Sequence, residues 1–588
     1  MTTTNADSGA LVEPSAAREV LDENRRTELD EAIAELSEGE KHWVSMTLTQ
    51  RVQLLSQLHT TVAAAAERWV SAGTKAKNLS PLSPYVGEEW ISGPYIVLST
   101  VAMLRRSLNA IAQGSSPIAQ AKLRTAPGGR VSVAVLPSSA YESVLLHGFS
   151  AEVWMKPGIS ANTVRSAAGL GARHPERAAG VGLVLGAGNI TSIPPLDVLY
   201  ELFAHNRVAL LKLNPVLDEM AEPYARAFAP LIELGLLRIV TGGGDVGGYL
   251  AHHPGISHVH ITGSAATHDV VVWGSGRGGA SRKESGIPLL QKPITSELGG
   301  VAPIIVLPGK WSTADLKYQA EHVATQRLHN GGYNCIAGQI VVLSANWPHK
   351  EAFVDQLRIA LDNAPDRASW YPGSGDRISS ASTTYPKAEK LGVGGGRLLV
   401  NIRNSEDASI IEKTEYFSPV LGVIELVGTG QAYLDTAIET VNRDFAGTLG
   451  ANILASPATI KSLGRGFENA LSHLEYGTIA INAWTGVGFL TAGAPWGAFP
   501  GHTLQNVQSG IGVVHNALLL DDTEKTIVRG PFRPFPRSVA HGEFTLFPKP
   551  PWFVSARSAR ATGRLLSGFA ANPSWAKMPA VFFSAFRA

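Results

Sequence analysis

Two neighbouring stretches of the chain decide the fold class: VGLVLGAGNI at residues 181–190 and VALLKLNP at residues 208–215. Each is a short apolar run that ends in glycine, asparagine or proline, which is typical of a buried strand followed by a loop. Similar short apolar runs occur at residues 131–136, 238–240 and 258–261. The residues between the later runs have helical character. Strands that alternate with helices predict a mainly parallel sheet with helices on both faces.

The composition excludes several other classes of protein. The chain has 588 residues, of which 44% are apolar and 17% charged, and its formal net charge is +1. This balance is that of a globular protein with more than one domain, and it gives no reason to expect nucleic acid as a partner. Cys335 is the only cysteine, so intramolecular disulfides and cysteine-built zinc clusters are excluded. We find no signal pattern at residues 1–12 and no apolar run of about 18 residues, so we expect a soluble, cytoplasmic protein.

The rest of the chain extends this organisation. Residues 1–26 are small, polar and charged and are expected to form a mobile leader, whereas Leu29, Ile33 and Leu36 recur at helical spacing. The glycine-rich breaks at residues 242–244 and 274–279 are expected to be loops beside strand ends. A second α/β series is expected from about residue 303 to residue 426.

The most reactive candidate is the thiol of Cys335, which ends the sequence Asn330-Gly331-Gly332-Tyr333-Asn334-Cys335. A lone cysteine is usually inert packing, but two glycines permit a tight turn, and a helix starting after it would lower the thiol pKa. A thiolate there could attack a carbonyl carbon, while its own backbone N–H holds the resulting oxyanion.

Glu297 is the candidate general base. It lies in Thr295-Ser296-Glu297-Leu298-Gly299-Gly300, before the expected strand at residues 303–307. Partial burial in such a tight place would raise the pKa of its carboxyl group towards the range of a general base. The alternative is a surface glutamate in a loop.

Three further segments follow expected strands: Gly186 to Ile190, Leu211 to Pro215, and His260 to Ser264, after which residues 265–273 are expected to be helical. Strand ends that lead into helix N-termini are natural nucleotide sites, because their free N–H groups and the helix dipole favour phosphate. His252, His253, His258 and His260 also suggest a metal site, but no carboxylate lies between them, and we expect no metal.

Taken in order, these segments resemble the signature series of the aldehyde dehydrogenase superfamily over roughly residues 40–515. The resemblance rests on Asn189, Lys212, Thr262-Gly263-Ser264, Glu297-Leu298-Gly299-Gly300, Cys335, Glu415-Tyr416-Phe417-Ser418-Pro419, Gly477 to Asn482 and Pro495-Trp496-Gly497.

The resemblance implies a role for each of these residues. Cys335 would be the nucleophile that forms a thiohemiacetal with an aldehyde, Asn189 would hold the oxyanion, and Glu297 would activate the water that hydrolyses the thioester. The cofactor, NAD or NADP, would be bound by Lys212, Asn214, Thr262, Gly263, Ser264, Leu298, Gly299, Glu415 and Phe417. Among these, Lys212 would contact the adenosine ribose, Ser264 the pyrophosphate, Glu415 the nicotinamide ribose and Phe417 the nicotinamide ring.

The sequence departs from the family pattern at three places. Tyr333 stands where the family usually has glutamine, so packing of the cysteine loop must differ. Pro215 stands where NAD-preferring members carry a glutamate for the ribose 2′-hydroxyl, so NADP stays open. Residues 274–292 look like an insertion, whose Arg277, Arg282 and Lys283 either reach a phosphate or, as we prefer, solvate a loop.

The implied architecture has two doubly wound α/β domains and a small β oligomerisation arm. The expected cofactor domain comprises residues 27–127 and 161–296, the catalytic domain residues 297–476, the arm residues 128–160 and 477–515, and a basic, aromatic extension residues 516–588. A homodimer or homotetramer is expected. We interpret the extension as packing across the body or a neighbouring subunit, with peripheral membrane contact as the alternative.

The function implied is oxidation of an aldehyde to a carboxylic acid. Trp484, Phe489 and Trp496 suggest an apolar or aromatic substrate. The first alternative is an acyl-CoA reductase or CoA-acylating dehydrogenase, which often lacks the water-activating glutamate. The second is a non-catalytic binding or structural member of the fold, against which the joint presence of Cys335, Glu297 and Asn189 argues.

Overall fold

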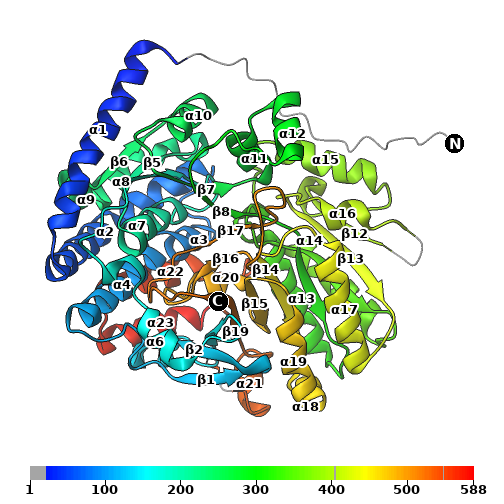
Figure 1. The fold of residues 1–588 in the computed structure, drawn as a ribbon. Coiled ribbons are helices and arrows are strands. Elements are labelled where there is room, and N and C mark those ends of the chain that lie inside the picture. Colours follow the sequence, from blue (N-terminus) through cyan, green and yellow to red (C-terminus); the bar gives the residue numbers. More distant parts are fainter. Residues whose placement is uncertain (1–20, 403–405, 544, 547–548) are drawn as a thin grey trace.

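The computed structural model describes residues 21–402, 406–543, 545–546 and 549–588 (Figure 1). Residues 1–20 of the expected leader therefore lie outside the described residues. Helix α1 (Glu23–Ser45) begins before residue 26, so the expected leader ends too late. Asp22 caps this helix by accepting a hydrogen bond from the Arg25 N–H, and Leu29, Ile33 and Leu36 are buried on one face, as their spacing predicts.

A six-stranded sheet occupies the first half of the molecule. Its order is β17-β8-β7-β4-β5-β6, and every neighbouring pair is parallel except β17 with β8. The strands are β4 (Val181–Leu185), β5 (Val208–Lys212), β6 (Leu237–Val240), β7 (His258–Gly263), β8 (Ile294–Leu298) and β17 (Gly510–Ile511). Because β5 and β7 lie on opposite sides of β4, the strand order reverses beside β4, and such a reversal is where ligands bind in open α/β sheets.

Helices surround this sheet, as the alternation of runs predicts. They are α2 (Leu48–Ala76), α4 (Ile96–Ala112), α7 (Ile193–His205), α8 (Ala221–Ala227), α9 (Ala229–Glu233), α10 (Gly244–His252), α11 (Ala265–Trp273) and α12 (Gly276–Ser285), together with α1. Residues 218–234 are helical, as expected of the residues between the runs, and form the end of a 3-10 turn, η4 (Pro215–Met220), and two short helices. One expectation needs correction: residues 276–279 start α12 where a loop was expected.

An eleven-stranded sheet forms the second half, in the order β1-β2-β3-β19-β15-β14-β9-β10-β13-β12-β11. The strands from β19 to β12 are parallel, and the pairs at both ends are antiparallel. They are β1 (Leu123–Ala126), β2 (Arg130–Leu136), β3 (Ser150–Met155), β9 (Ala302–Val306), β10 (Gly338–Ser344), β11 (Glu389–Leu391), β12 (Arg397–Asn401), β13 (Val420–Leu426), β14 (Gly450–Leu454), β15 (Thr478–Ile481) and β19 (Thr523–Arg529).

The helices that accompany this sheet are α13 (Thr313–Leu328), α14 (Lys350–Asn363), α15 (Ser374–Thr384), α16 (Ser409–Lys413), α17 (Gly430–Asp444), α18 (Pro457–Leu463), α19 (Arg465–His473) and α20 (Thr485–Phe489). Strands β16 (Trp496–Gly497) and β18 (Val513–Val514) form a separate small pair. The α/β class and the second α/β series are as expected.

The segments expected to form a separate arm are part of this large sheet. Strands β2 and β3, from residues 128–160, join it through β19, which pairs with β3 on one side and β15 on the other. Residues 477–515 supply β15 inside the sheet and β17 beside Glu297. Strand β19 lies beyond the expected limit at residue 515, yet it pairs with β3 and β15 from the two expected pieces of the arm.

The C-terminal segment packs across the body of the same chain. Helix α22 (Ala559–Ala571) lies beside α3 (Val86–Trp90) and the π-helical turn η1 (Ile91–Tyr95), red against blue in Figure 1, and α23 (Met578–Ala585) packs against α22. The aromatic rings of Trp552 and Phe149 meet edge to face at 5.6 Å, and Phe553 stacks on Tyr318. The short helices α5 (Ala140–Leu145), α6 (Ala161–Ala167) and α21 (Arg537–Ala540) complete the fold. This packing is the arrangement that our preferred interpretation of the extension expects.

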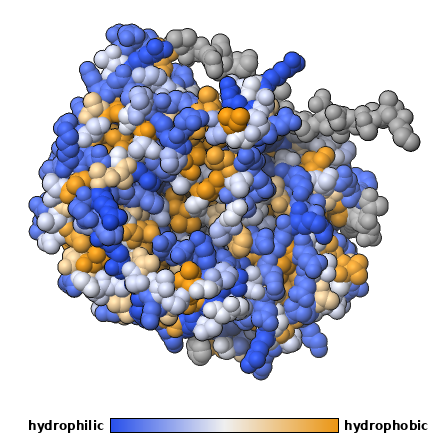
Figure 2. Space-filling view, viewed as in Figure 1, coloured by the Kyte–Doolittle hydropathy of each residue, from blue (hydrophilic) through white to orange (hydrophobic). Residues whose placement is uncertain are grey.

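On the face drawn in Figure 2, polar and charged side chains cover most of the surface, and apolar side chains gather towards the centre. Within the described ranges, no helix combines the length and the apolar character needed to cross a membrane.

Candidate active site

The cysteine loop is a tight turn between α13 and β10. Asn330, Gly331 and Gly332 have φ values of +55°, +73° and +84°, a conformation that glycine and asparagine adopt most readily. The Asn330 side-chain amide donates to the carbonyl oxygens of Asn189, at 3.0 Å, and Tyr333, at 3.1 Å. The loop is therefore fastened to the end of β4, and the two glycines act as the sequence predicts.

Glu297 lies beside Cys335 at the end of β8. Its side chain is buried, the Trp496 indole N–H donates to its Oε1 at 3.2 Å, and the Cys335 thiol lies close enough to affect its ionisation. Burial raises the pKa of Glu297 to about 7, and the neighbouring thiol and indole only partly offset this effect. The expected buried carboxylate is therefore present, and the alternative of a surface loop glutamate is wrong.

The expected lowering of the Cys335 pKa by a following helix is wrong. The residues after Cys335 turn into β10, so no helix N-terminus faces the sulfur. Burial raises the pKa of the thiol well above its usual range, and the carboxylates of Glu297 and Glu415 add to this rise. The resting group is a thiol, and it needs a base to become a nucleophile.

Asn189 is close to the cysteine loop but already uses part of its amide. Its Nδ2 donates to the Tyr333 carbonyl oxygen at 2.9 Å. An amide nitrogen carries two hydrogens, so one remains for a ligand. The Tyr333 ring points away from the thiol, since its hydroxyl bonds the Ser369 and Ser374 hydroxyls at 2.9 and 2.8 Å. The loop therefore accommodates tyrosine in place of glutamine by directing the ring away from the thiol.

Glu415 and Phe417 lie on the other side of Glu297. Glu415 packs against Gly299 so closely that a Cβ atom at residue 299 would lie 2.1 Å from its Oε1, so a larger residue there would displace the Glu415 carboxyl group. That Oε1 is buried without a hydrogen-bond partner, and burial raises the pKa of Glu415 to about 8. Phe417, at a φ of +43°, packs against Tyr371 with ring centroids 5.0 Å apart.

The other expected cofactor residues lie at the ends of β5, β7 and β8. Lys212 is buried, which lowers its pKa, while Asp218 and Asp245 act in the opposite direction. Asn214 caps η4 by accepting from the Val216 N–H and packs against Gly188. Leu298 is buried in β8 and donates its N–H to the Ser509 carbonyl oxygen.

Residues 262–264 divide between two environments. Gly263 and Ser264 are exposed, and the Ser264 hydroxyl caps α11 by accepting from the Thr267 N–H at 3.1 Å. The Thr262 hydroxyl is buried and donates to Asp197 Oδ2 at 2.9 Å. Thr262 therefore faces inward, away from the exposed end of α11 where a phosphate is expected.

The histidines of β7 bind carboxylates. His260 lies 3.6 Å from Asp197, which also lies 3.7 Å from His515, and His258 lies 3.2 Å from Glu201. Burial alone would raise the pKa of Asp197, but the two histidines outweigh it and hold the pKa below its usual range. His252 and His253 lie at the end of α10. Across the described part of the chain, no group of three or more His, Cys, Asp or Glu residues is arranged to hold a metal ion.

A mainly apolar pocket leads to the thiol. Trp484, Phe489 and Trp496 all line it together with Cys335, Asn189 and Asn334, so the three aromatics that the sequence singled out do lie at the entrance. Sequence reasoning missed Ile91, His329 and Trp552, which line the same pocket. The only signal for Trp552 is its position among the prolines of the C-terminal extension.

Comparisons with known proteins agree on one family. A sequence model described as the aldehyde dehydrogenase family matches residues 206–365. A curated relative, betaine aldehyde dehydrogenase 2 of Rhizobium meliloti (strain 1021), is 28% identical over 356 residues, which are 57% of this chain and 62% of the relative. The match thus spans under two thirds of the length of that curated relative.

Solved structures show the same fold. A γ-glutamyl-γ-aminobutyraldehyde dehydrogenase from Burkholderia cenocepacia J2315 superposes with a TM-score of 0.57 at 18% identity, covering 85% of this chain and 88% of that one. An NADP-dependent glyceraldehyde-3-phosphate dehydrogenase from Bacillus halodurans C-125, complexed with NADP, gives a TM-score of 0.55 at 19% identity, covering 86% and 91%. At these identities the likeness establishes the fold alone.

Proposed function

We propose that the chain is an aldehyde dehydrogenase, which oxidises an aldehyde to a carboxylic acid through Cys335 with NAD or NADP as the oxidant; the family model over residues 206–365, the curated relative and the shared fold support this. The observation that carries the proposal is the closeness of the only thiol of the chain to Glu297, a buried carboxyl group with a pKa of about 7. A base of that pKa is half ionised near neutral pH, where a general base is most effective.

Glu297 takes the proton of the Cys335 thiol as the sulfur attacks. A sulfur–carbon bond forms, the carbonyl π electrons move to oxygen, and the product on Cys335 is a thiohemiacetal. The remaining N–H of the Asn189 amide and the backbone N–H of Cys335 are the donors available to hold the oxyanion.

The residues at the strand ends fit a dinucleotide. The exposed N-terminus of the nine-residue helix α11 suits a phosphate, and the unpartnered Glu415 Oε1 suits a ribose hydroxyl. Lys212 offers a cation at the end of β5. When bound there, an oxidised nicotinamide nucleotide supplies the two-electron acceptor that aldehyde oxidation requires. Lys212, Ser264 and Glu415 would hold it, while Thr262 would act only by bonding Asp197.

Oxidation leaves a thioester on Cys335, and Glu297 then acts a second time. Having released its first proton, the carboxylate draws a proton from water, the hydroxide attacks the thioester carbon, and the C–S bond breaks to release the carboxylic acid. The Trp496 indole, which donates to one carboxylate oxygen, holds Glu297 in place for both steps. A CoA-dependent enzyme of this fold needs no such base, so Glu297 favours water over CoA as acceptor.

Replacement of the nucleophile tests the proposal. We expect Cys335→Ala to abolish aldehyde-dependent formation of reduced nicotinamide while the Kd of the nucleotide changes less than threefold. Turnover should be independent of added CoA. Turnover retained in the alanine variant would contradict the role of Cys335, and an absolute requirement for CoA would favour the acyl-CoA alternative. If the wild type binds the nucleotide yet oxidises no aldehyde, the non-catalytic alternative holds.

A further inference from the structure

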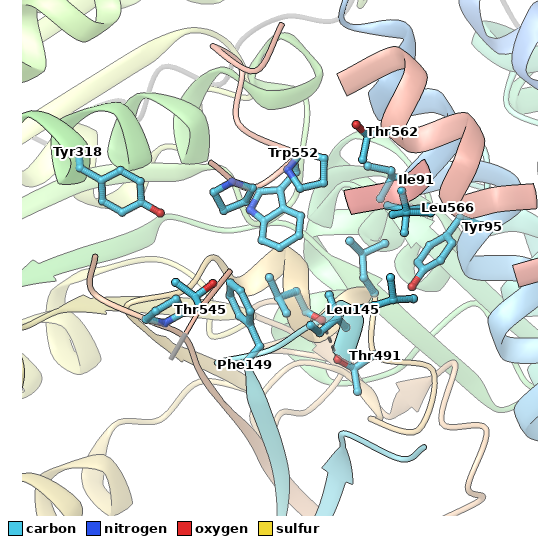
Figure 3. A pocket seen from close by; sticks show the side chains of 17 residues that line it. Ile91, Tyr95, Leu145, Phe149, Tyr318, Thr491, Thr545, Trp552, Thr562 and Leu566 are labelled. Atoms are coloured by element: carbon cyan, nitrogen blue, oxygen red, sulfur yellow. Dashed lines mark hydrogen bonds between the residues drawn. The ribbon is translucent and has the colours of Figure 1, made fainter. Parts of the chain in front are cut away.

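A second cavity opens behind the pocket that contains Cys335. Its walls come from η1, α5, α20 and the C-terminal segment, and Figure 3 shows Trp552, Leu566, Thr562, Leu145, Phe149 and Tyr95 pointing towards one space. We refer to this cavity as the outer chamber and to the pocket at Cys335 as the inner pocket. The two share Ile91, Leu490 and Trp552 as lining residues, so they adjoin across these three side chains.

The chemistry of the outer chamber is apolar. Among its lining residues in the described chain none is charged, and most are aliphatic, aromatic or proline. Two of its hydroxyl groups are already engaged: Thr491 donates to the Val487 carbonyl oxygen at 2.8 Å, and Thr562 bonds the Ser584 hydroxyl at 2.9 Å. A charged group placed there would lose its hydration with no oppositely charged lining residue to compensate.

The C-terminal wall is built into the fold. The Ser567 hydroxyl donates to the Trp90 carbonyl oxygen at 3.0 Å, which joins α22 to the end of α3. A Cβ atom at Gly563 would lie 2.9 Å from the Gly87 carbonyl oxygen, so the two backbones touch. On the other side the Tyr141 ring meets Phe569 at 5.3 Å. The wall is therefore preformed, which reduces the entropy cost of binding.

We propose that the outer chamber binds the tail of the substrate, and that the substrate is an unbranched aliphatic aldehyde whose tail runs from Cys335 past Leu490 and Trp552 to α22. This inference rests on the proposed function, because it places the aldehyde carbon at Cys335. It assigns the C-terminal extension the role of a substrate wall, since Pro550, Pro551 and Trp552 and helices α22 and α23 supply one side of the chamber.

The size of the space selects a slender tail. The volume that the centre of a water molecule can occupy is about 50 Å³ in the outer chamber and about 40 Å³ in the inner pocket. Such a volume holds a few waters or a methylene chain and excludes bulky ring systems. The free energy of transferring one methylene group from water to an apolar site corresponds to a factor of about four. Each further methylene group of the tail should therefore raise kcat/KM about fourfold.

The test compares aldehydes of increasing length in two tryptophan variants of neighbouring residues on α22. Leu566 lines the outer chamber, so Leu566→Trp fills it, whereas Leu565 is 37% exposed and does not line it. In the wild type and Leu565→Trp we expect kcat/KM to rise at least 100-fold from propanal to decanal. In Leu566→Trp we expect kcat/KM for propanal to equal that of the wild type and kcat/KM for decanal to be at least tenfold lower than in the wild type.

A binding measurement separates this inference from the proposed function. Calorimetry with 1-decanol, which cannot be oxidised through a thiohemiacetal, should show binding to the wild type and Leu565→Trp and at least tenfold weaker binding to Leu566→Trp. If decanol binds in this pattern and no aldehyde is oxidised, the chamber proposal stands and the proposed function fails. If propanal is oxidised but chain length and Leu566→Trp have no effect, the chamber proposal is overturned and the function stands.

Discussion

Two pairs of glutamates near the cysteine loop differ in their partners. Behind the loop, Glu89 lies 2.5 Å from the Lys77 ammonium, and Glu88 lies 2.5 Å from the Arg367 guanidinium. At the thiol, Glu297 accepts a hydrogen bond from the neutral Trp496 indole, and Glu415 Oε1 has no hydrogen-bond partner among the described residues.

The pKa values follow the partners. Burial alone would raise the pKa of Glu88, but His329 and Arg367 outweigh it and hold the pKa below its usual range. Burial raises the pKa of Glu297 to about 7 and that of Glu415 to about 8, because no cation contacts them closely enough to compensate. Burial alone therefore does not turn a glutamate into a general base. Glu88 and Glu89, which pair with cations, hold the loop in place, whereas Glu297 and Glu415 can exchange protons near neutral pH.

The largest expected effect is on the paired region. Lys77 and Glu89 are both fully buried, and Lys77 also donates to Asn330 Oδ1 at 3.0 Å. Lys77→Met should lower the free energy of unfolding by about 3–5 kcal/mol, because it leaves a buried carboxylate unpaired. Lys75→Met, which removes the exposed pair with Glu219, should cost less than about 1 kcal/mol in urea unfolding. Equal costs would show that the buried pair is not what secures the loop.

The next effect is on catalysis in the unpaired region. Glu297→Gln keeps the shape of the side chain but removes the base, so steady-state turnover should fall about 10²–10⁴-fold. Hydrolysis should slow more than oxidation, and rapid mixing should then show a burst of reduced nicotinamide before a slow steady rate. A wild-type steady rate would exclude Glu297 from the mechanism.

A smaller effect is expected on stability. The folded-state pKa of Glu415 is raised from the ordinary 4.5 to about 8, so its favourable contribution is complete below pH 4.5 and is lost as the pH rises to about 8. Glu415→Gln removes this loss and should be more stable than the wild type by about 1–3 kcal/mol at pH 9, with a smaller gain at pH 6. Urea unfolding at both pH values measures this, and the exposed Glu439→Gln is the control. A gain in the free energy of unfolding that does not depend on pH would contradict the raised pKa of Glu415.

The smallest effect concerns the choice of cofactor. Pro215 begins η4 and is exposed, so a glutamate there should be tolerated. We predict that the wild type uses NADP within about tenfold of NAD, a difference of about 1.4 kcal/mol, and that Pro215→Glu lowers kcat/KM for NADP selectively by charge repulsion. Pro215→Gln should not do so. A wild-type preference for NAD of a hundredfold or more would assign the selectivity to other groups, of which Asp218 and Asp245 beside Lys212 are the first candidates.

The sequence predicted the local elements well and their long-range partners poorly. The runs 181–185 and 265–273 coincide with β4 and α11, because a continuous apolar run and a serine cap are local signals. The motifs also placed Cys335, Glu297 and Asn189 within one site. The bond from Trp496 to Glu297 joins residues 199 positions apart, and no local pattern reveals it.

Two corrections have the same physical cause. A helix after Cys335 was expected from the local turn, but pairing of β10 with β9 and β13 makes that segment a strand. The arm and the extension were divided at residue 515, but β19 from the extension pairs with β3 and β15, which both come from the expected arm. Tertiary pairing thus overrode local expectation in both places.

The central claim, that Glu297 is the base for Cys335, can be measured directly because the chain has one thiol. The rate of alkylation of Cys335 by iodoacetamide is followed from pH 5 to pH 10 in the wild type and Glu297→Gln, with Cys335→Ala as the blank. The account predicts a rise in the wild type with an inflection near pH 7, where Glu297 ionises, and no such inflection in Glu297→Gln, because burial keeps the pKa of its thiol raised. Identical profiles in the two proteins would contradict it.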